Sequence, residues 1–276
     1  MSATKNWPPE YYCYSEQYVW YCSYGSNINS DRFSIYLKGG KPIGSGQSAP
    51  HVSGSRISTP PLDSQPILLR NTQMLFSRVS RTWSGGGVCF TSFKNRNENN
   101  HVKFETINNL KCFGNSMDNN CCCSDVGGQD FENVVLGRIH KILWHQFVDV
   151  VSQENGGTNC HLKEGNSIQQ SLDSNYNEII NRLQESGGEF KMFDTWYGSV
   201  VLIGFHPIDN CPIISFTTSE FQKEIVNRAH ESYLKTVGKG IMDTFEFCAK
   251  ICALYFLSKP GVKEFYSLTE LLNVMQ

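Results

Sequence analysis

The residue best suited to proton transfer is Glu154, a glutamate on the apolar side of a predicted helix. The segment LWHQFVDVVSQE, residues 143–154, places Phe147, Val150 and Val151 on one face, and Glu154 follows Phe147 by seven residues on that same face. Burial raises the pKa of a carboxyl group and lets it take and return a proton near neutral pH. The pattern therefore predicts a general acid/base, although a glutamate at a helix end before two glycines also fits a solvent-exposed position.

A second candidate is the tetrapeptide YGSN, residues 24–27, which ends a predicted strand over 19–24. Glycine, serine and asparagine are ordinary turn formers, so the loop by itself indicates no more than a tight bend. Together with a distant carboxylate, it would instead be one wall of a small-molecule site.

The main alternative to a site at Glu154 is one that uses cysteine as a metal ligand or nucleophile. The chain has 11 cysteines, an odd number, and no export signal, which favours reduced thiols in a cytoplasmic protein. The adjacent residues Cys121 to Cys123, even with Cys112 nearby, lack the two-residue gaps of a zinc loop, and we expect no metal site. Cys160 beside His161 in a polar loop cannot easily form an oriented nucleophile and base.

Charge and hydropathy limit the partners. The formal net charge of −2 offers no basic surface for nucleic acid. The most apolar stretch, Ile241 to Leu257, carries Asp243, Glu246 and Lys250 at helical spacing, which predicts an amphipathic helix and no membrane span. We therefore expect a small-molecule partner, and the sequence leaves the oligomeric state open.

The chain is predicted to consist of an N-terminal tail, residues 1–18, and one domain, residues 19–276. Polar composition marks long surface insertions at about 94–130 and 155–188, and a further polar surface stretch at 38–64. Short strands and separate helices in this order predict an α+β fold. The predicted strands are Val19–Tyr24, Gln73–Arg78, Gly87–Thr91, Asn133–Ile142, Gly198–Phe205 and Pro212–Phe216.

Two more helices have sequence signals. Ser30 is a candidate cap for a short helix with Phe33 and Leu37 on one face. Ser219 and Gln222 fit a capping box, followed by an apolar stripe that runs through Tyr233 to Gly238.

Three segments in this order resemble the γ-glutamylcyclotransferase-like family. The strand and loop VWYCSYGSNI, the segment SRTWSGGGVCF and the segment VLGRIHKILWHQFVDVVSQENG match the family's YGSN loop, its Trp-Gly-Gly strand and the helix that ends in its glutamate. The resemblance covers most of 19–241 without the two insertions. Cys22, Ser23 and a longer glycine run at 85–87 depart from the family pattern.

The resemblance implies a small mixed β-barrel flanked by helices, with a pocket for a γ-glutamyl group. The implied reaction is attack of the substrate's α-amino group on its own γ-amide carbonyl, releasing 5-oxoproline and an amine without a cofactor. Glu154 is then the general acid/base. The implied substrate-binding residues are Tyr24, Gly25, Ser26, Asn27, Tyr197 and Tyr233.

In this interpretation the N–H groups of Gly25, Ser26 and Asn27 hold the substrate's α-carboxylate, as other helix-entry loops hold anions. Tyr197 and Tyr233 are equally typical of buried structural tyrosines. The leaving amine stays open among glutathione, γ-glutamyl amino acids, γ-glutamyl amines and larger conjugates. The alternative function is a non-catalytic module of the same fold that binds γ-glutamyl or related amides.

Overall fold

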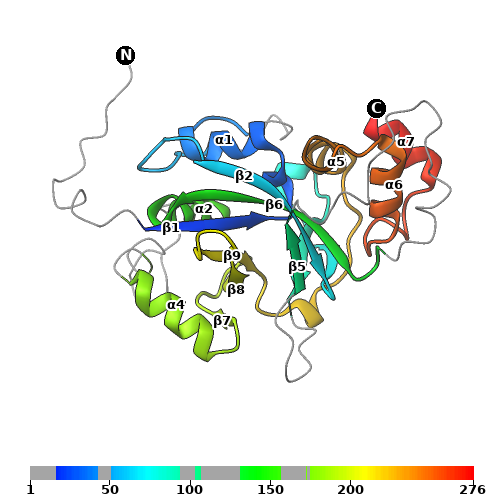
Figure 1. Ribbon diagram of the computed structural model, residues 1–276. Helices are drawn as coiled ribbons and strands as arrows, with labels where there is room; N and C mark the ends of the chain where they lie inside the picture. The colour runs from blue at the N-terminus through cyan, green and yellow to red at the C-terminus, as the bar shows by residue number, and fades with distance from the viewer. Residues whose placement is uncertain (1–16, 43–50, 94–102, 107–130, 157–171, 173–174) are drawn as a thin grey trace, which may run out of the picture.

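The computed structural model describes residues 17–42, 51–93, 103–106, 131–156, 172 and 175–276 (Figure 1). Its centre is a mixed sheet of seven strands in the order β5-β2-β6-β1-β9-β8-β7, and a separate hairpin pairs β3 with β4. The strands are β1 (Tyr18–Ser23), β2 (Asp63–Arg70), β3 (Gln73–Ser77), β4 (Val88–Ser92), β5 (Lys103–Thr106), β6 (Val134–Leu143), β7 (Glu189–Lys191), β8 (Ser199–Phe205) and β9 (Pro212–Thr217).

Strand β1 is central because both of its faces are apolar. It pairs antiparallel with β6 and parallel with β9, so that β1 and β9 end at the same edge of the sheet. Val19 and Tyr21 belong to one buried cluster, and Trp20 and Cys22 to the other. This alternation follows from the two-residue period of a strand, and it places an apolar core on each side of the sheet.

Helices pack on both faces of the sheet (Figure 1). The core that contains Val19 is shared with α1 (Ser30–Lys38), α2 (Trp144–Glu154) and α4 (Tyr176–Glu185). On the opposite face the hairpin packs with the C-terminal helices. These are α5 (Glu231–Phe245), α6 (Ala249–Leu257) and α7 (Leu268–Met275).

The fold is therefore α+β, as predicted, with a mixed sheet flanked by helices. The sheet curls into a half-barrel and does not close, because β5 and β7 are its two edges (Figure 1). The six predicted strands are all present, and each boundary is shifted by one residue or less. The division into a tail and one domain stays a prediction.

The predicted helix from Ser219 to Gly238 is wrong in its first half. Only a short 3-10 helix, Phe221–Lys223, forms there, and α5 begins at Glu231 after His230 as its N-cap. The intervening chain makes bridges to the hairpin, from Val226 to Ser77 and from Ala229 to Gly87. These tertiary bridges override a local helical pattern.

Two other helix boundaries differ from prediction. The N-cap of α1 is Asn29, whose side-chain oxygen accepts from the Arg32 N–H at 3.1 Å, and Ser30 is already the first helical residue. The predicted helix over 241–257 is two helices, because Glu246 adopts a left-handed conformation between α5 and α6. A single left-handed residue ends a helix.

The predicted surface insertions contain regular structure where they are described. Within 155–188, α4 buries Ile179, Ile180 and Leu183 against the core, and within 94–130, β5 pairs with β2. Sequence reasoning also missed β2, because its polar first half hides the buried run Ile67–Leu69. In the described residues, no helix combines the length and the apolar character needed to cross a membrane.

Candidate active site

Glu154 is the last residue of α2, which packs against β1 and the start of α1. Asn27 Nδ2 donates to Glu154 Oε1 at 2.8 Å, and the Tyr36 hydroxyl also donates to this carboxylate. Burial raises the pKa of Glu154. The charge of Arg32 and the hydrogen bonds from Asn27 and Tyr36 lower this pKa, but the net pKa stays above the ordinary value.

The YGSN loop lies beside this carboxylate at the end of β1. The Ile28 N–H donates to the Gly25 carbonyl at 3.0 Å, which closes the short 3-10 helix Ser26–Ile28. The first N–H groups of a helical turn have no acceptor inside that turn. Asn27 is buried, and its Oδ1 atom has no hydrogen-bond partner among the described residues. An acceptor is thus left open next to Glu154.

Gly25 is required by the packing of two neighbouring side chains. A Cβ atom at this position would lie 3.0 Å from Cys89 Sγ and 3.2 Å from the Tyr233 hydroxyl. The Tyr233 hydroxyl accepts from the Cys89 N–H at 3.2 Å and lies 3.1 Å from Cys89 Sγ. Burial raises the pKa of Cys89 to about 12, so this group is a thiol near neutral pH.

Two further tyrosines complete the walls. The Tyr24 hydroxyl donates to the Phe216 carbonyl at 2.8 Å, which ties the end of β1 to β9. Tyr197 is held through its backbone by Asn155, whose Oδ1 accepts from the Tyr197 N–H at 3.0 Å. The Tyr24 hydroxyl therefore has a structural role as well as a place in the site, and the backbone of Tyr197 is anchored beside Glu154.

Two adjoining cavities meet at Glu154. The inner chamber has a volume of about 30 Å³ and lies between the YGSN loop and Cys89. The outer chamber has a volume of about 170 Å³ and opens past Arg32 and Trp83. Four residues line both chambers: Ser26, Glu154, Tyr197 and Tyr233.

The structure brings every residue of the predicted site together. Glu154, Ser26, Tyr197 and Tyr233 line both chambers, and Tyr24, Gly25 and Asn27 line the inner one. These residues come from distant parts of the chain and converge at the carboxyl ends of the parallel strands β1 and β9. Their roles in binding and catalysis stay predictions.

Sequence reasoning missed three polar or aromatic residues of the outer chamber, Arg32, Tyr36 and Trp83. Arg32 and Tyr36 lie four residues apart on the buried face of α1. Both residues are next to the predicted core residues Phe33 and Leu37, and this position could have identified them. An arginine is rarely buried unless it has a partner or a function.

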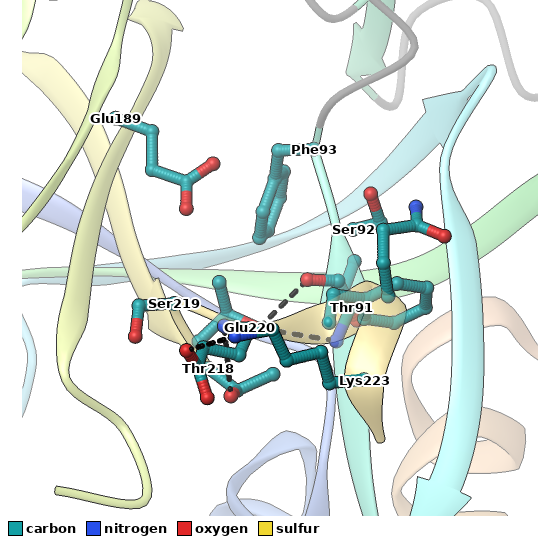
Figure 2. A pocket seen from close by; sticks show the side chains of 11 residues that line it. Thr91, Ser92, Phe93, Glu189, Thr218, Ser219, Glu220 and Lys223 are labelled. Carbon is teal, nitrogen blue, oxygen red and sulfur yellow. Dashed lines mark hydrogen bonds and ion pairs between the residues drawn. The ribbon is translucent and has the colours of Figure 1, made fainter. Parts of the chain in front are cut away.

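A separate cavity of about 230 Å³ lies where β4 and β9 end, and Figure 2 shows Phe93 on one wall of it and Glu189 on another. Its lining is rich in hydroxyl groups. Thr217 Oγ1 donates to the Thr91 carbonyl at 2.7 Å, and Lys223 pairs with Glu220 at 2.8 Å. The Lys223 hydrogen bond and charge lower the pKa of Glu220. Glu220 is therefore no counterpart of Glu154.

Among the described residues, no group of three or more histidine, cysteine or acidic side chains is placed to bind a metal ion. Cys112, Cys121 to Cys123, Cys160 and His161 lie outside the described residues. Cys22, Cys89, Cys211, Cys248 and Cys252 are free thiols in the described part of the chain.

No family model and no curated protein matches this chain. Two solved structures are similar to it, with low sequence identity and low TM-scores. An uncharacterized protein from Homo sapiens is 11% identical, with 94% of this chain and 99% of that chain covered and a TM-score of 0.38. A yeast γ-glutamyl cyclotransferase specific to glutathione is 12% identical, with 94% and 96% covered and a TM-score of 0.29. Likeness at this level does not establish a family.

The chemistry open to this site follows from its own geometry. It presents a carboxylate of raised pKa that lines both chambers, several tyrosines, and an amide oxygen that has no hydrogen-bond partner within the described part of the chain. A buried carboxylate of raised pKa is suited to exchanging protons with a bound ligand.

Proposed function

We propose that the protein is a γ-glutamyl cyclotransferase-type enzyme that releases 5-oxoproline and an amine from a γ-glutamyl amide. The observation that carries the proposal is the convergence of Glu154, with its raised pKa, and the YGSN loop on one chamber. The partner is a small γ-glutamyl molecule, the reaction needs no cofactor, and the reduced thiols favour a cytoplasmic location.

In the proposed complex, the γ-glutamyl group lies between the YGSN loop and Glu154. Its α-carboxylate accepts from backbone N–H groups of Gly25, Ser26 and Asn27, at the start of the short 3-10 helix. Its α-ammonium group faces the Glu154 carboxylate and the open Asn27 Oδ1 acceptor. This arrangement would give Asn27 Oδ1 a donor and add a third donor to the Glu154 carboxylate.

The proposed reaction is intramolecular. Glu154 takes a proton from the α-ammonium group, and the neutral nitrogen attacks the γ-carbonyl carbon to form the ring C–N bond. Glu154 then returns the proton to the leaving nitrogen, and the original amide C–N bond breaks. The ring nitrogen gives up its second proton, which the released amine takes up as an ammonium group. Orientation within one folded molecule supplies roughly 7–11 kcal/mol of such a barrier, and general acid/base catalysis adds about 10²- to 10⁴-fold.

The alternative is a binding module that keeps the pocket without the reaction. A measurement of turnover distinguishes the two proposals, because a binding module would bind a γ-glutamyl amide or 5-oxoproline and release no product.

The test is 5-oxoproline release from a panel of γ-glutamyl amino acids, amines and glutathione. Wild type is compared with Glu154→Gln at equal concentrations of folded protein, and Glu224→Gln is the matched control because Glu224 lies outside both chambers. Release by wild type and by Glu224→Gln, with none from Glu154→Gln, supports the enzyme. Binding of 5-oxoproline without release from any substrate supports the binding module.

A further inference from the structure

Asn155 follows Glu154 directly in the chain, and its side chain bonds to the facing wall of the site. Its Oδ1 atom accepts from the Tyr197 N–H at 3.0 Å, and its Nδ2 atom donates to the Tyr197 carbonyl at 3.3 Å. One side-chain amide thus bonds both backbone groups of Tyr197, as the backbone of a paired strand would. Asn155 is buried, so water competes little for these bonds.

The ring of Tyr197 lies where the two chambers join. Its centre is 5.1 Å from that of Phe90 and 5.4 Å from that of Phe216, and Tyr197 lines both chambers together with Glu154. Burial raises the pKa of Tyr197 well above its usual value, and the neighbouring Tyr233 and Glu154 groups raise it further. The Tyr197 hydroxyl is therefore a neutral hydrogen-bond donor near the carboxylate.

We propose that Asn155 is a positioning residue that fixes Tyr197 against Glu154 at the junction of the chambers. The inference rests on the proposed function, in which the γ-glutamyl end fills the inner chamber and the amine extends into the outer one. The reacting γ-carbonyl group then lies between Glu154 and Tyr197. Because Asn155 is joined covalently to Glu154, its amide sets the separation of the two walls, and catalysis is sensitive to such distances.

A different role for Asn155 makes different predictions. Its Nδ2 atom also donates to the Val151 carbonyl at 3.0 Å, so Asn155 could act only as a cap at the end of α2. Loss of a cap would lower stability and leave the kcat of the folded protein unchanged. Loss of positioning would instead lower kcat and leave KM nearly unchanged, because the YGSN loop and Glu154 hold the substrate's charged groups in the proposed complex.

The experiment measures 5-oxoproline release by Asn155→Ala at equal concentrations of folded protein, with the γ-glutamyl compound that wild type cleaves fastest. We expect kcat to fall by about 10- to 100-fold and KM to change by less than about threefold. Asn155→Ser is the second variant. Its shorter hydroxyl can still bond the Val151 carbonyl, so we expect a smaller loss of stability with the same fall in kcat.

Gln146 provides the matched control on the same helix. It is buried outside both chambers, and its Nε2 atom donates to the carbonyls of Ile57 and Thr59 at 2.9 and 2.8 Å. Gln146→Ala therefore also removes hydrogen bonds from a side-chain amide to a loop backbone. It is expected to lower the urea midpoint of unfolding and to leave kcat within about threefold of wild type.

A double-mutant cycle tests whether Asn155 acts through Tyr197. Tyr197→Ala removes the ring that Asn155 is proposed to position. Adding Asn155→Ala to this variant should then lower kcat by less than about threefold, because the two losses share one cause.

Fluorine NMR of protein labelled with fluorotyrosine gives a readout that needs no turnover. The Tyr197 signal is assigned by its disappearance in Tyr197→Phe. We expect this signal to move in ligand-free Asn155→Ala and to stay in place in Gln146→Ala.

The outcomes distinguish failure of the positioning role from failure of the cyclotransferase. An unchanged kcat and an unmoved Tyr197 signal in Asn155→Ala would overturn the positioning role and leave the cyclotransferase intact. A moved Tyr197 signal without 5-oxoproline release from wild type would support the positioning of Tyr197 and overturn the cyclotransferase. Additive losses in the double variant, or an equal fall in kcat for Gln146→Ala, would also overturn the positioning role.

Discussion

Two glutamates of this protein have similar surroundings and opposite electrostatics. Glu154 lies near Arg32, which stacks on Trp83, and Glu224 lies near Arg78, whose Cζ atom is 5.3 Å from the centre of the Trp196 ring. Each site thus combines a partly buried carboxylate with an arginine on a tryptophan.

The difference lies in the direct partners. Arg78 Nε donates to both Glu224 oxygens at 3.0 and 3.1 Å, and Ser77 and Thr218 add hydrogen bonds at 2.7 and 3.0 Å. Burial alone would raise the pKa of Glu224, but these partners outweigh burial and lower it.

The hydrogen bonds to Glu154 come instead from the neutral side chains of Asn27 and Tyr36, and burial prevails. An ion-paired carboxylate remains ionised and stabilises the fold. A buried carboxylate with neutral donors has a raised pKa and is better suited to proton transfer.

The largest expected effect is on turnover. Glu154→Gln should lower kcat by about 10²- to 10⁴-fold, because an amide cannot transfer the proton, while 5-oxoproline binding persists. Glu224→Gln should change kcat by less than about threefold. Steady-state release of 5-oxoproline measures both, and full activity of Glu154→Gln would remove this residue from the mechanism.

The two substitutions should affect stability in the reverse order, with the larger loss for Glu224→Gln. Glu224→Gln is expected to lower the free energy of unfolding by about 1–3 kcal/mol at pH 7, because it weakens charged hydrogen bonds to Arg78. Glu154→Gln should not lower it. Urea unfolding of both variants measures the difference, and an equal loss in the two would contradict the contrast between the sites.

The close packing around the YGSN loop predicts a coupled effect. Gly25→Ala should reduce kcat/KM by about tenfold, because the new Cβ would lie 3.0 Å from Cys89 Sγ and displace the wall of the inner chamber. The double variant with Cys89→Ala should recover part of this loss, since the two residues are in contact. Strictly additive losses would show that the two positions act independently.

The two glutamates should also give opposite dependences of stability on pH. The folded-state pKa of Glu154 lies above its unfolded value of about 4.3, so its contribution is fully present at lower pH and is lost as pH rises through the folded pKa. Glu224 has a lowered pKa, so its contribution is present above the unfolded value and is lost as pH falls.

Subtracting the unfolding free energies of each glutamine variant from those of wild type, across pH 3 to 8, isolates the two contributions. Slopes of the same sign would refute the assignment. The measurement needs no substrate, so it tests the electrostatics independently of the proposed reaction.

The smallest effect is expected in the larger cavity of Figure 2. Thr91 is fully buried there, and its hydroxyl oxygen has no hydrogen-bond partner among the described residues. Thr91→Val should change the unfolding free energy by less than about 1 kcal/mol and kcat by less than twofold. A large loss of activity would show that this cavity takes part in the reaction.

The sequence by itself determined those helices and strands in which the spacing of apolar residues shows which face is buried. The apolar alternation of 19–24 predicted the central strand, and the spacing of Phe147 and Glu154 predicted a carboxylate on the inner side of α2. Through the YGSN motif and the resemblance that it carries, it also predicted seven of the ten residues that line the inner chamber, but not Tyr21, Cys89 or Phe216.

Only the tertiary structure decided the remainder. The chain near Val226 pairs with the hairpin and forms no helix, because bridges between distant segments outweigh local propensity. The placement of Arg32 on Trp83, 51 residues apart by their numbers, depends on how α1 meets the loop before β4. Likewise, the contrast between Glu154 and Glu224 arises from partners distant in sequence, since a pKa depends on neighbours in space.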